Sequence, residues 1–349
     1  MNYLHRQFPG FVLVALSVCI LSGCSGPSAT TDKRQFLPEE AGSARPYTSE
    51  DFDAAGDRFT FAVHSDLTGG ERDGIFDIAI AQLSLLRPEF IINVGDLIEG
   101  GSEDPAEINA QWNSFDERAG RARAPLFRVG GNHDLTGEVM RNLWRERYGR
   151  TWYHFRYKDV LFLVLDTEDN TPERMQEIFE ARNHALEVSR TQGWDAFSKT
   201  GYAAMPENAA GNITAEQSKY FVDVIAANTD VRWTFLFMHK APWLREDLAA
   251  FTAIEDALAD RPYTVFNGHQ HAYAYLKRRG RDYIRLATTG GVQLTGKGRS
   301  VDQVTLVTVT DDGVDIANLL LQGILDKTGL IPLGGDALCF EAAKCTNAE

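Results

Sequence analysis

Metal-binding and acid–base residues follow five separate apolar runs of the sequence. The five groups are His64-Ser65-Asp66, Gly95-Asp96, Gly131-Asn132-His133-Asp134, His239 and Gly268-His269-Gln270-His271. A carboxylate, amide or imidazole at the end of a buried strand costs desolvation free energy, which a bound dication can offset. Histidine binds Zn, Fe or Mn, and carboxylates bind the harder ions of that set. These residues therefore predict a metal site.

The apolar runs must form the elements that position these groups. Each run is rich in β-branched or aromatic residues, and the runs are Phe59 to Val63, Phe90 to Val94, Leu126 to Val129, Trp233 to Met238 and Tyr263 to Phe266. Helix-like stretches separate most of them, which predicts an α/β protein with largely parallel central strands. Ligands of such proteins bind at the carboxyl ends of the strands, where these groups lie.

The order and content of the motifs resemble the calcineurin-like metallophosphoesterase family. That family's pattern is Asp-x-His, Gly-Asp, Gly-Asn-His-Asp/Glu, His and Gly-His-x-His, and the resemblance covers roughly Phe59 to Ile316. It implies a four-layer αββα sandwich. It also implies an enzyme that hydrolyses small phosphate esters, either monoesters or diesters.

The resemblance implies two divalent or trivalent metal ions, which would be Mn, Fe or Zn. One ion would be held by Asp66, Asp96 and His271, and the other by Asp96, Asn132, His239 and His269. Two ions about 3.5 to 4 Å apart repel each other and need an anion between them. Asp96 suits this bridging position because Gly95 and the following loop leave its carboxylate open on both sides.

His133 follows a ligand but would be catalytic and not itself a ligand. Its neighbour Asp134 would orient the imidazole and keep it protonated, so that His133 donates to the leaving oxygen or stabilises the transition-state charge. A hydroxide bridging the metals would attack phosphorus in line. Gly131 and Gly268 would let the backbone come close to the metals.

The first motif departs from the family pattern, because Asp66-Leu67-Thr68 replaces Asp-x-His. One ion therefore loses an imidazole, and its affinity should fall. Thr68 could offer its hydroxyl as a weak ligand or hold a ligated water, or it could be an ordinary turn residue. His64 could replace the missing ligand, or it could be a core histidine with a backbone partner. The departure also leaves a second function open, that of a degenerate member that binds a phosphorylated ligand or partner without turnover.

Two further features lie near the motifs. Lys240 follows His239 and could contact a substrate phosphate, but strand alternation favours a direction away from the metals and exposure to solvent. Residues 167–211 carry no family motif and read as an insertion, which could form a lid over the metals or pack on the sandwich edge.

The amino terminus predicts the location of the protein. Residues 1–23 resemble a lipoprotein signal peptide, with an apolar stretch from Phe11 to Leu21 and a lipobox-like ending before Cys24, which would be lipidated. The alternative is an uncleaved anchor or a cytosolic start. Residues 24–57 read as a flexible tether. We therefore expect an extracytoplasmic protein attached to the membrane only through lipid, at the periplasmic face of the outer membrane if the organism is Gram-negative.

The rest of the chain is assigned by length and composition. Residues 58–325 are predicted to form the metallophosphoesterase domain and residues 326–349 a tail, in which Cys339 and Cys345 form a disulfide or remain free thiols. With 35 basic and 49 acidic residues, the net charge of −14 argues against nonspecific binding to nucleic acid or anionic lipid. Small phosphate esters remain open as substrates because two dications dominate the local charge. The sequence makes no prediction of the oligomeric state.

Overall fold

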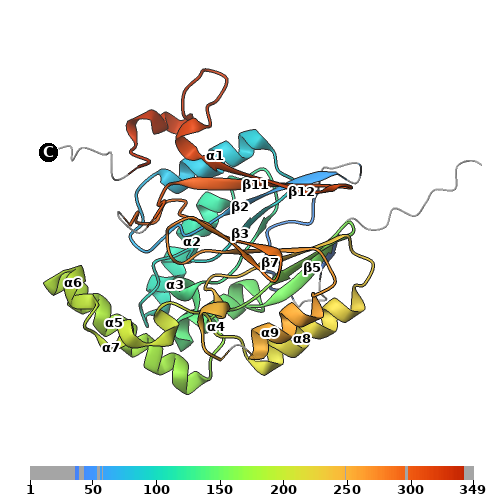
Figure 1. Ribbon diagram of the computed structural model, residues 1–349. Helices are drawn as coiled ribbons and strands as arrows, with labels where there is room; N and C mark the ends of the chain where they lie inside the picture. Colours follow the sequence, from blue (N-terminus) through green and yellow to red (C-terminus); the bar gives the residue numbers. More distant parts are fainter. Residues whose placement is uncertain are drawn as a thin grey trace, which may run out of the picture. The chain divides into compact units, whose positions relative to one another are not determined.

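The computed structural model describes residues 36–38, 43–52, 56, 58–247, 249–294 and 298–341. Within this range two β-sheets pack face to face, and helices cover the outer face of each sheet (Figure 1). Three large apolar clusters fill the three spaces between these four layers. The predicted αββα sandwich is confirmed.

The strands that carry the motifs are parallel within each sheet. The five-stranded sheet has the order β12 (Gly313–Leu320), β11 (Gln303–Thr310), β2 (Phe59–His64), β3 (Ile91–Asn93) and β4 (Leu126–Phe127). The seven-stranded sheet has the order β1 (Phe36–Pro38), β5 (Tyr153–Tyr157), β6 (Val160–Val164), β7 (Trp233–Phe237), β8 (Tyr263–Asn267), β10 (Arg281–Arg285) and β9 (Ala274–Arg278). β2, β3 and β4 are parallel to one another, and β6, β7 and β8 are likewise parallel. Each parallel set therefore directs its carboxyl ends to one edge of its sheet.

Period-two alternation along the strands builds the layers. Phe59, Phe61 and Val63 of β2 point into the core between the sheets, whereas Ala62 points towards the helices. Aromatic rings dominate the core between the sheets, where Phe61 stacks on Phe90 with ring centroids 5.1 Å apart. A strand that is covered on both faces needs apolar residues at successive positions, which explains the continuous apolar runs of the sequence.

Two groups of helices cover the sheets. The five-stranded sheet is covered by α1 (Ile75–Leu86), α2 (Pro105–Ala119) and α4 (Glu138–Tyr148), and the seven-stranded sheet by α8 (Ala215–Ala227) and α9 (Ala249–Ala257). The one-turn helix α3 (Asn132–Leu135) lies within the Gly-Asn-His-Asp motif. Short 3-10 helices occur at η2 (Pro242–Leu244), η3 (Leu321–Gly323) and η4 (Pro332–Ala337).

Residues 167–211 form a helical insertion beside α4 (Figure 1). Its elements are α5 (Pro172–Gln192), α6 (Trp194–Phe197), α7 (Gly201–Ala204) and the 3-10 helix η1 (Pro206–Asn208). Phe197, Tyr202 and Met205 pack with α5 in a small apolar cluster, while Trp194 is 68% exposed. The aromatic residues therefore stabilise the insertion itself and do not form an apolar cover over the metal ligands.

The prediction that residues 24–57 form a flexible tether is wrong for the described residues 36–38 and 43–52, which pack on the folded body. Strand β1 pairs with β5, Tyr47 pairs with Phe127, and the Phe52 ring lies 4.7 Å from the Tyr157 ring. These aromatic side chains supply enough apolar area to join the core, although the composition around them is polar.

Residues 1–23, Cys24 and the segment that follows it up to residue 35 lie outside the described residues. Among the helices of the described residues, none combines the length and apolar character needed to cross a bilayer.

The described part of the predicted tail, residues 326–341, belongs to the folded body. Ile331 and Phe340 join the apolar cluster around α1, and Gln293 Nε2 donates to the Phe340 carbonyl at 2.8 Å. The predicted boundary at residue 325 is therefore wrong, because the described residues after it pack against the same core as those before it. Cys339 is disulfide-bonded, whereas Cys345 lies outside the described residues, so their pairing stays a prediction.

Candidate metal centre

The strand ends of both sheets bring the six expected ligands together. Two groups of side chains each present ligand atoms within 4.8 Å of one another, namely Asp66, Asp96 and His271 in one group and Asp96, His239 and His269 in the other. Asp96 belongs to both groups, and its side chain is almost fully buried. This is the arrangement that a two-ion centre with a bridging carboxylate requires.

Asn132 adds a neutral oxygen to the second group. Its Oδ1 lies 3.1 Å from His239 Nε2, which in turn lies 3.1 Å from Asp96 Oδ2. His239 Nε2 thus faces two oxygen atoms, both of which are acceptors when Asp96 is ionised. Such a nitrogen must carry either a proton or a metal ion.

The ring orientation of each histidine ligand is fixed by a backbone carbonyl. His239 Nδ1 lies 2.8 Å from the Val94 oxygen, His271 Nδ1 lies 2.6 Å from the Val292 oxygen, and His269 Nε2 lies 2.8 Å from the Asn208 oxygen. A carbonyl can only accept, so the proton must be on the nitrogen that faces it, and the second nitrogen is free to bind a cation. The donor set therefore fits two dications of the Mn, Fe or Zn type.

The pKa shifts of the ligands also indicate a site that favours positive charge. Burial lowers the pKa of His239, but the Asp96 carboxylate outweighs burial and raises it to about 9. Burial raises the pKa of Asp96, and the His239 and His133 rings outweigh it and hold that pKa well below its usual range. Burial and the positive charges of Lys240 and His239 lower the pKa of His269. The raised pKa of His239 and the lowered pKa of Asp96 both show that positive charge is stabilised between these two side chains.

Three of the ligands have left-handed backbone conformations. The φ angles are 59° at Asp96, 74° at His269 and 48° at His271. Non-glycine residues rarely adopt this region, and such strain persists only where the surroundings enforce it. One enforcing contact is that between Asp66 Oδ1 and the His269 N–H, at 2.9 Å.

Two glycines of the motifs let these ligands fit. A Cβ atom at Gly131 would overlap the Asp96 carboxylate, and a Cβ atom at Gly268 would overlap that of Asp66. The expected close approach of the backbone thus takes place against the ligand side chains.

Asp134 does not have the role expected of it. Its carboxylate accepts four backbone N–H groups, those of Asp96, Leu97, Ile98 and Gly131, at 2.8 to 3.2 Å. These contacts fix the Asp96 loop to the Gly131 turn and leave no contact with the His133 imidazole. The prediction that Asp134 orients His133 is therefore wrong, and Asp134 positions the bridging ligand instead.

His133 is oriented by two other groups. Its Nδ1 lies 2.7 Å from the Glu99 carbonyl oxygen, and its Nε2 lies 2.9 Å from Nη2 of Arg182. Burial and the Arg182 charge lower the pKa of His133 to about 4, so the ring is neutral near pH 7, with its proton on Nδ1. This contradicts the expectation of a protonated ring. His133 Nε2 nevertheless lies 4.0 Å from Asp96 Oδ2, at the edge of the centre.

Thr68 and His64 do not complete the ligand set. The Thr68 hydroxyl donates to the Ile98 carbonyl at 2.8 Å, which favours the interpretation as a turn residue. The His64 ring packs on Phe76 with centroids 5.4 Å apart, and neither of its nitrogens has a hydrogen-bond partner. Because β2 ends at His64, strand alternation does not extend to Asp66. The predictions of a replacement ligand and of a backbone partner for His64 are both wrong.

Lys240 is fully buried, contrary to the expected exposure to solvent. Its Nζ donates to Glu168 Oε2 at 3.0 Å and to the Glu207 carbonyl at 2.7 Å. β7 ends at Phe237, so strand alternation does not extend to Lys240, and the helical insertion encloses its side chain.

Two residues of the insertion contact the centre and were missed by the sequence analysis. Arg182 contacts His133, and the Asn208 carbonyl contacts His269. No motif marks either residue. The sequence does hold one signal for Arg182. Ile178, Arg182 and Ala185 follow i, i+4 and i+7 spacing, which places this arginine on the buried apolar face of α5.

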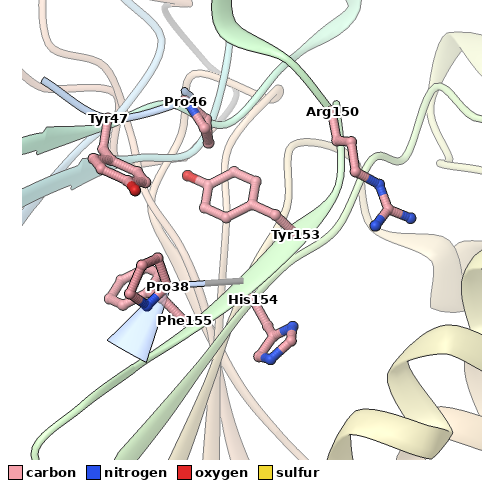
Figure 2. A pocket seen from close by; sticks show the side chains of 7 residues that line it. All are labelled: Pro38, Pro46, Tyr47, Arg150, Tyr153, His154 and Phe155. Atoms are coloured by element: carbon pink, nitrogen blue, oxygen red, sulfur yellow. The ribbon is translucent and has the colours of Figure 1, made fainter. Parts of the chain in front are cut away.

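A separate pocket lies beside β1 and β5 and contains none of the six expected ligands (Figure 2). Tyr153 and Phe155 line it together with Pro38 and Tyr47. His154 also lines it, and its Nδ1 lies 2.6 Å from the Tyr220 hydroxyl. This contact is typical of a structural histidine. This pocket has no cluster of metal-binding groups.

Comparisons with known proteins bear on the family and the fold. The family model described as calcineurin-like phosphoesterase matches residues 59–273. No curated protein matches the sequence significantly. The purple acid phosphatase PPD1 from yellow lupin seeds superposes with a TM-score of 0.50 at 12% identity, covering 78% of this chain and 53% of the lupin chain. A dimetal phosphatase from Danio rerio has a TM-score of 0.49 at 13% identity, covering 75% and 99% of the two chains. A 5'-nucleotidase from Candida albicans has a TM-score of 0.46 at 11% identity, covering 84% and 58%. At such identities the likeness concerns the fold alone.

Proposed function

This chain belongs to the calcineurin-like phosphoesterase family, a family of metal-dependent phosphoester hydrolases, and on that premise we propose that it hydrolyses small phosphate monoesters or diesters at the centre formed by its strand-end ligands. The observation that carries the proposal is the pair of ligand groups that share the buried carboxylate of Asp96. A binding protein without turnover has no evident need for a shared carboxylate between two cation positions.

We propose that the ions are Mn, Fe or Zn, held by the two groups of ligands and by Asn132. When bound, the two ions would supply an activated water and neutralise charge on the phosphate. Backbone carbonyls contact the rings of the histidine ligands and would hold them in place around the ions. This arrangement avoids reorganisation when charge develops in the transition state.

His133 is placed to act on the substrate from the edge of the centre. Its Nδ1 is held by Glu99, so only Nε2 can reach a substrate oxygen. To donate a proton from Nε2, the ring must take up a second proton and exchange its contact with Arg182 for one with the ester.

The degenerate alternative rests on the missing imidazole of the first motif. The Thr68 hydroxyl donates to the Ile98 carbonyl, so the group of Asp66, Asp96 and His271 has three protein ligands. Three ligands with open positions are typical of catalytic centres, so this departure is compatible with turnover.

We also propose that the protein is anchored by lipid at Cys24 and acts outside the cytoplasm. The signal-like residues 1–23 support this. A disulfide at Cys339 adds support, since such bonds persist mainly in oxidising compartments.

A metal-reconstitution assay tests the proposed reaction. The protein is stripped with a chelator, reloaded with Mn²⁺ or Zn²⁺, and assayed with p-nitrophenyl phosphate and bis(p-nitrophenyl) phosphate. We expect hydrolysis of at least one ester, its loss on stripping and its recovery on reloading. A protein that binds two ions per chain but hydrolyses neither ester would support the degenerate alternative.

A further inference from the structure

The insertion places a buried arginine at the metal centre. Arg182 lies on the apolar stripe of α5 and is only 3% exposed. Its neighbour Asn183 donates from Nδ2 to the Gly101 carbonyl at 3.5 Å, which holds this part of α5 against the loop that follows Asp96. The guanidinium is thereby brought to the catalytic edge of the centre and away from solvent.

The two terminal nitrogens of Arg182 are used differently. Nη2 lies 2.9 Å from His133 Nε2, which accepts its hydrogen bond. Nη1 is buried and has no hydrogen-bond partner, and it lies near Gly101, where a Cβ atom would approach it to 3.8 Å. One nitrogen is thus fixed by the catalytic imidazole, and the other is left free.

Other arginines around the insertion have carboxylate partners. Arg141 contacts Asp166 at 2.6 Å, and Arg174 contacts Glu207 at 2.6 Å. No carboxylate of the described residues forms an ion pair with Arg182. An arginine keeps its charge at any ordinary pH, and a buried charge without a partner is costly. The missing anion at Arg182 therefore points to a ligand from outside the chain.

We propose that Arg182 binds the phosphate group of the substrate, with Nη1 donating to a nonbridging oxygen while Nη2 is positioned by His133. The proposal rests on the proposed function and adds a phosphate-binding residue from the insertion to the strand-end ligands. A guanidinium suits this task because its planar geometry holds one donor on His133 Nε2 and leaves a second, charged donor for a phosphate oxygen.

Arg182→Met, with Arg190→Met as the matched control, tests the proposal. Both arginines lie on α5, but Arg190 is exposed and pairs only with Glu187 on its own helix. Binding of inorganic phosphate to the metal-loaded proteins is measured by calorimetry, and KM and kcat are measured with the ester that the wild type hydrolyses. Loss of a charged hydrogen bond should weaken phosphate binding by about 10- to 100-fold in Arg182→Met and raise KM. Arg190→Met should match the wild type, and both variants should keep two ions per chain.

The outcomes separate this proposal from the proposed function. Unchanged phosphate affinity in a folded, metal-loaded Arg182→Met protein would overturn the role of Arg182, even if the wild type hydrolyses esters. Weakened phosphate binding in a protein whose wild type hydrolyses neither ester would uphold Arg182 while the proposed function fails. If Arg182→Met does not fold, Arg182→Gln carries the test, because its amide can still donate to His133 Nε2 but brings no positive charge to a phosphate oxygen. Its phosphate affinity should fall about tenfold, and an affinity equal to that of the wild type would overturn the proposal.

Discussion

The strand-end ligands and the helical insertion reach the same centre by different means. The ligands are held from within, by backbone carbonyls on their rings and by backbone N–H groups on Asp134. The insertion is joined to the rest of the fold by the ion pairs of Lys240 with Glu168 and of Arg245 with Glu207. Arg174 also contacts Glu207, within the insertion itself. Metal chemistry thus dictates residue types along the strand ends, whereas only the tertiary structure places the insertion's contacts.

The two regions are nevertheless coupled. The Asn208 carbonyl of the insertion fixes the ring of His269, and Arg182 contacts the ring of His133. We therefore expect changes among the strand-end ligands to abolish metal binding outright. Changes at the attachment of the insertion should alter stability and substrate handling instead.

The largest effect is expected for Asp96→Asn. This side chain belongs to both ligand groups, so the variant should lose both ions and about four orders of magnitude of turnover or more. Elemental analysis of metal per chain is the measurement. Glu255→Gln is the control, because Glu255 is an equally buried carboxylate of α9 that pairs with Arg278, and it should keep both ions. Two ions retained by Asp96→Asn would contradict the bridging role.

His133→Ala should reduce turnover by about 10²- to 10⁴-fold and leave the metal content unchanged. The ring lies at the edge of the centre and is in neither ligand group. Steady-state kinetics and elemental analysis of the same sample decide the outcome. Loss of one ion per chain would show that His133 is a ligand.

Metal affinity should rise with pH in the group that contains His239. The pKa of this ring is raised to about 9 without metal, so below pH 9 an ion must displace its proton. The apparent affinity should then increase about tenfold per pH unit, or about 100-fold from pH 6 to pH 8. Zn²⁺ titrations at several pH values with a competing chelator measure this slope. A flat profile would mean that His239 is already deprotonated.

The sequence predicted the metal ligands better than the residues that orient the side chains of the centre. Asp66, Asp96 and His271 could be expected because each follows a strand within a recognisable motif, and the α/β layers followed from the apolar runs. The supports of His133 lie 34 and 49 residues away along the chain, at Glu99 and Arg182, where no motif indicates them. Asp134 was misassigned because adjacency in sequence suggested contact, whereas α3 directs its carboxylate to the backbone of the Asp96 loop.

Burial was also misjudged where a later segment covers a surface. Lys240 was expected to be exposed, but the insertion encloses it. Phe36 and Tyr47 occur in a polar stretch, yet they pack in the core between the sheets. Local pattern predicts the direction of a side chain and cannot predict which distant segment meets it.

Lys240→Met should lower the free energy of unfolding by about 3 to 5 kcal/mol. The substitution leaves the buried Glu168 carboxylate without its cation. Lys219→Met is the matched control, because Lys219 is exposed and pairs with Asp223 within one helix, and its removal should change stability little. Denaturant unfolding of both variants measures the difference. Recovery of stability in Lys240→Met combined with Glu168→Gln would show that the stranded charge is the cause.

The smallest effect is expected for Thr68→Val, which tests whether the departure from the family pattern concerns a ligand or a turn. Valine keeps the shape of threonine but removes the hydroxyl that donates to the Ile98 carbonyl. If this hydrogen bond is the role of Thr68, the free energy of unfolding should fall by about 1 kcal/mol, and both metal-binding steps should be unchanged. Thr68→Ser keeps the hydroxyl and should retain most of the stability. If Thr68 instead binds an ion or its water, Mn²⁺ titration should show the weaker step falling in Thr68→Val but not in Thr68→Ser. The two variants thus decide whether the group of Asp66, Asp96 and His271 works with three protein ligands, as the strand-end geometry indicates.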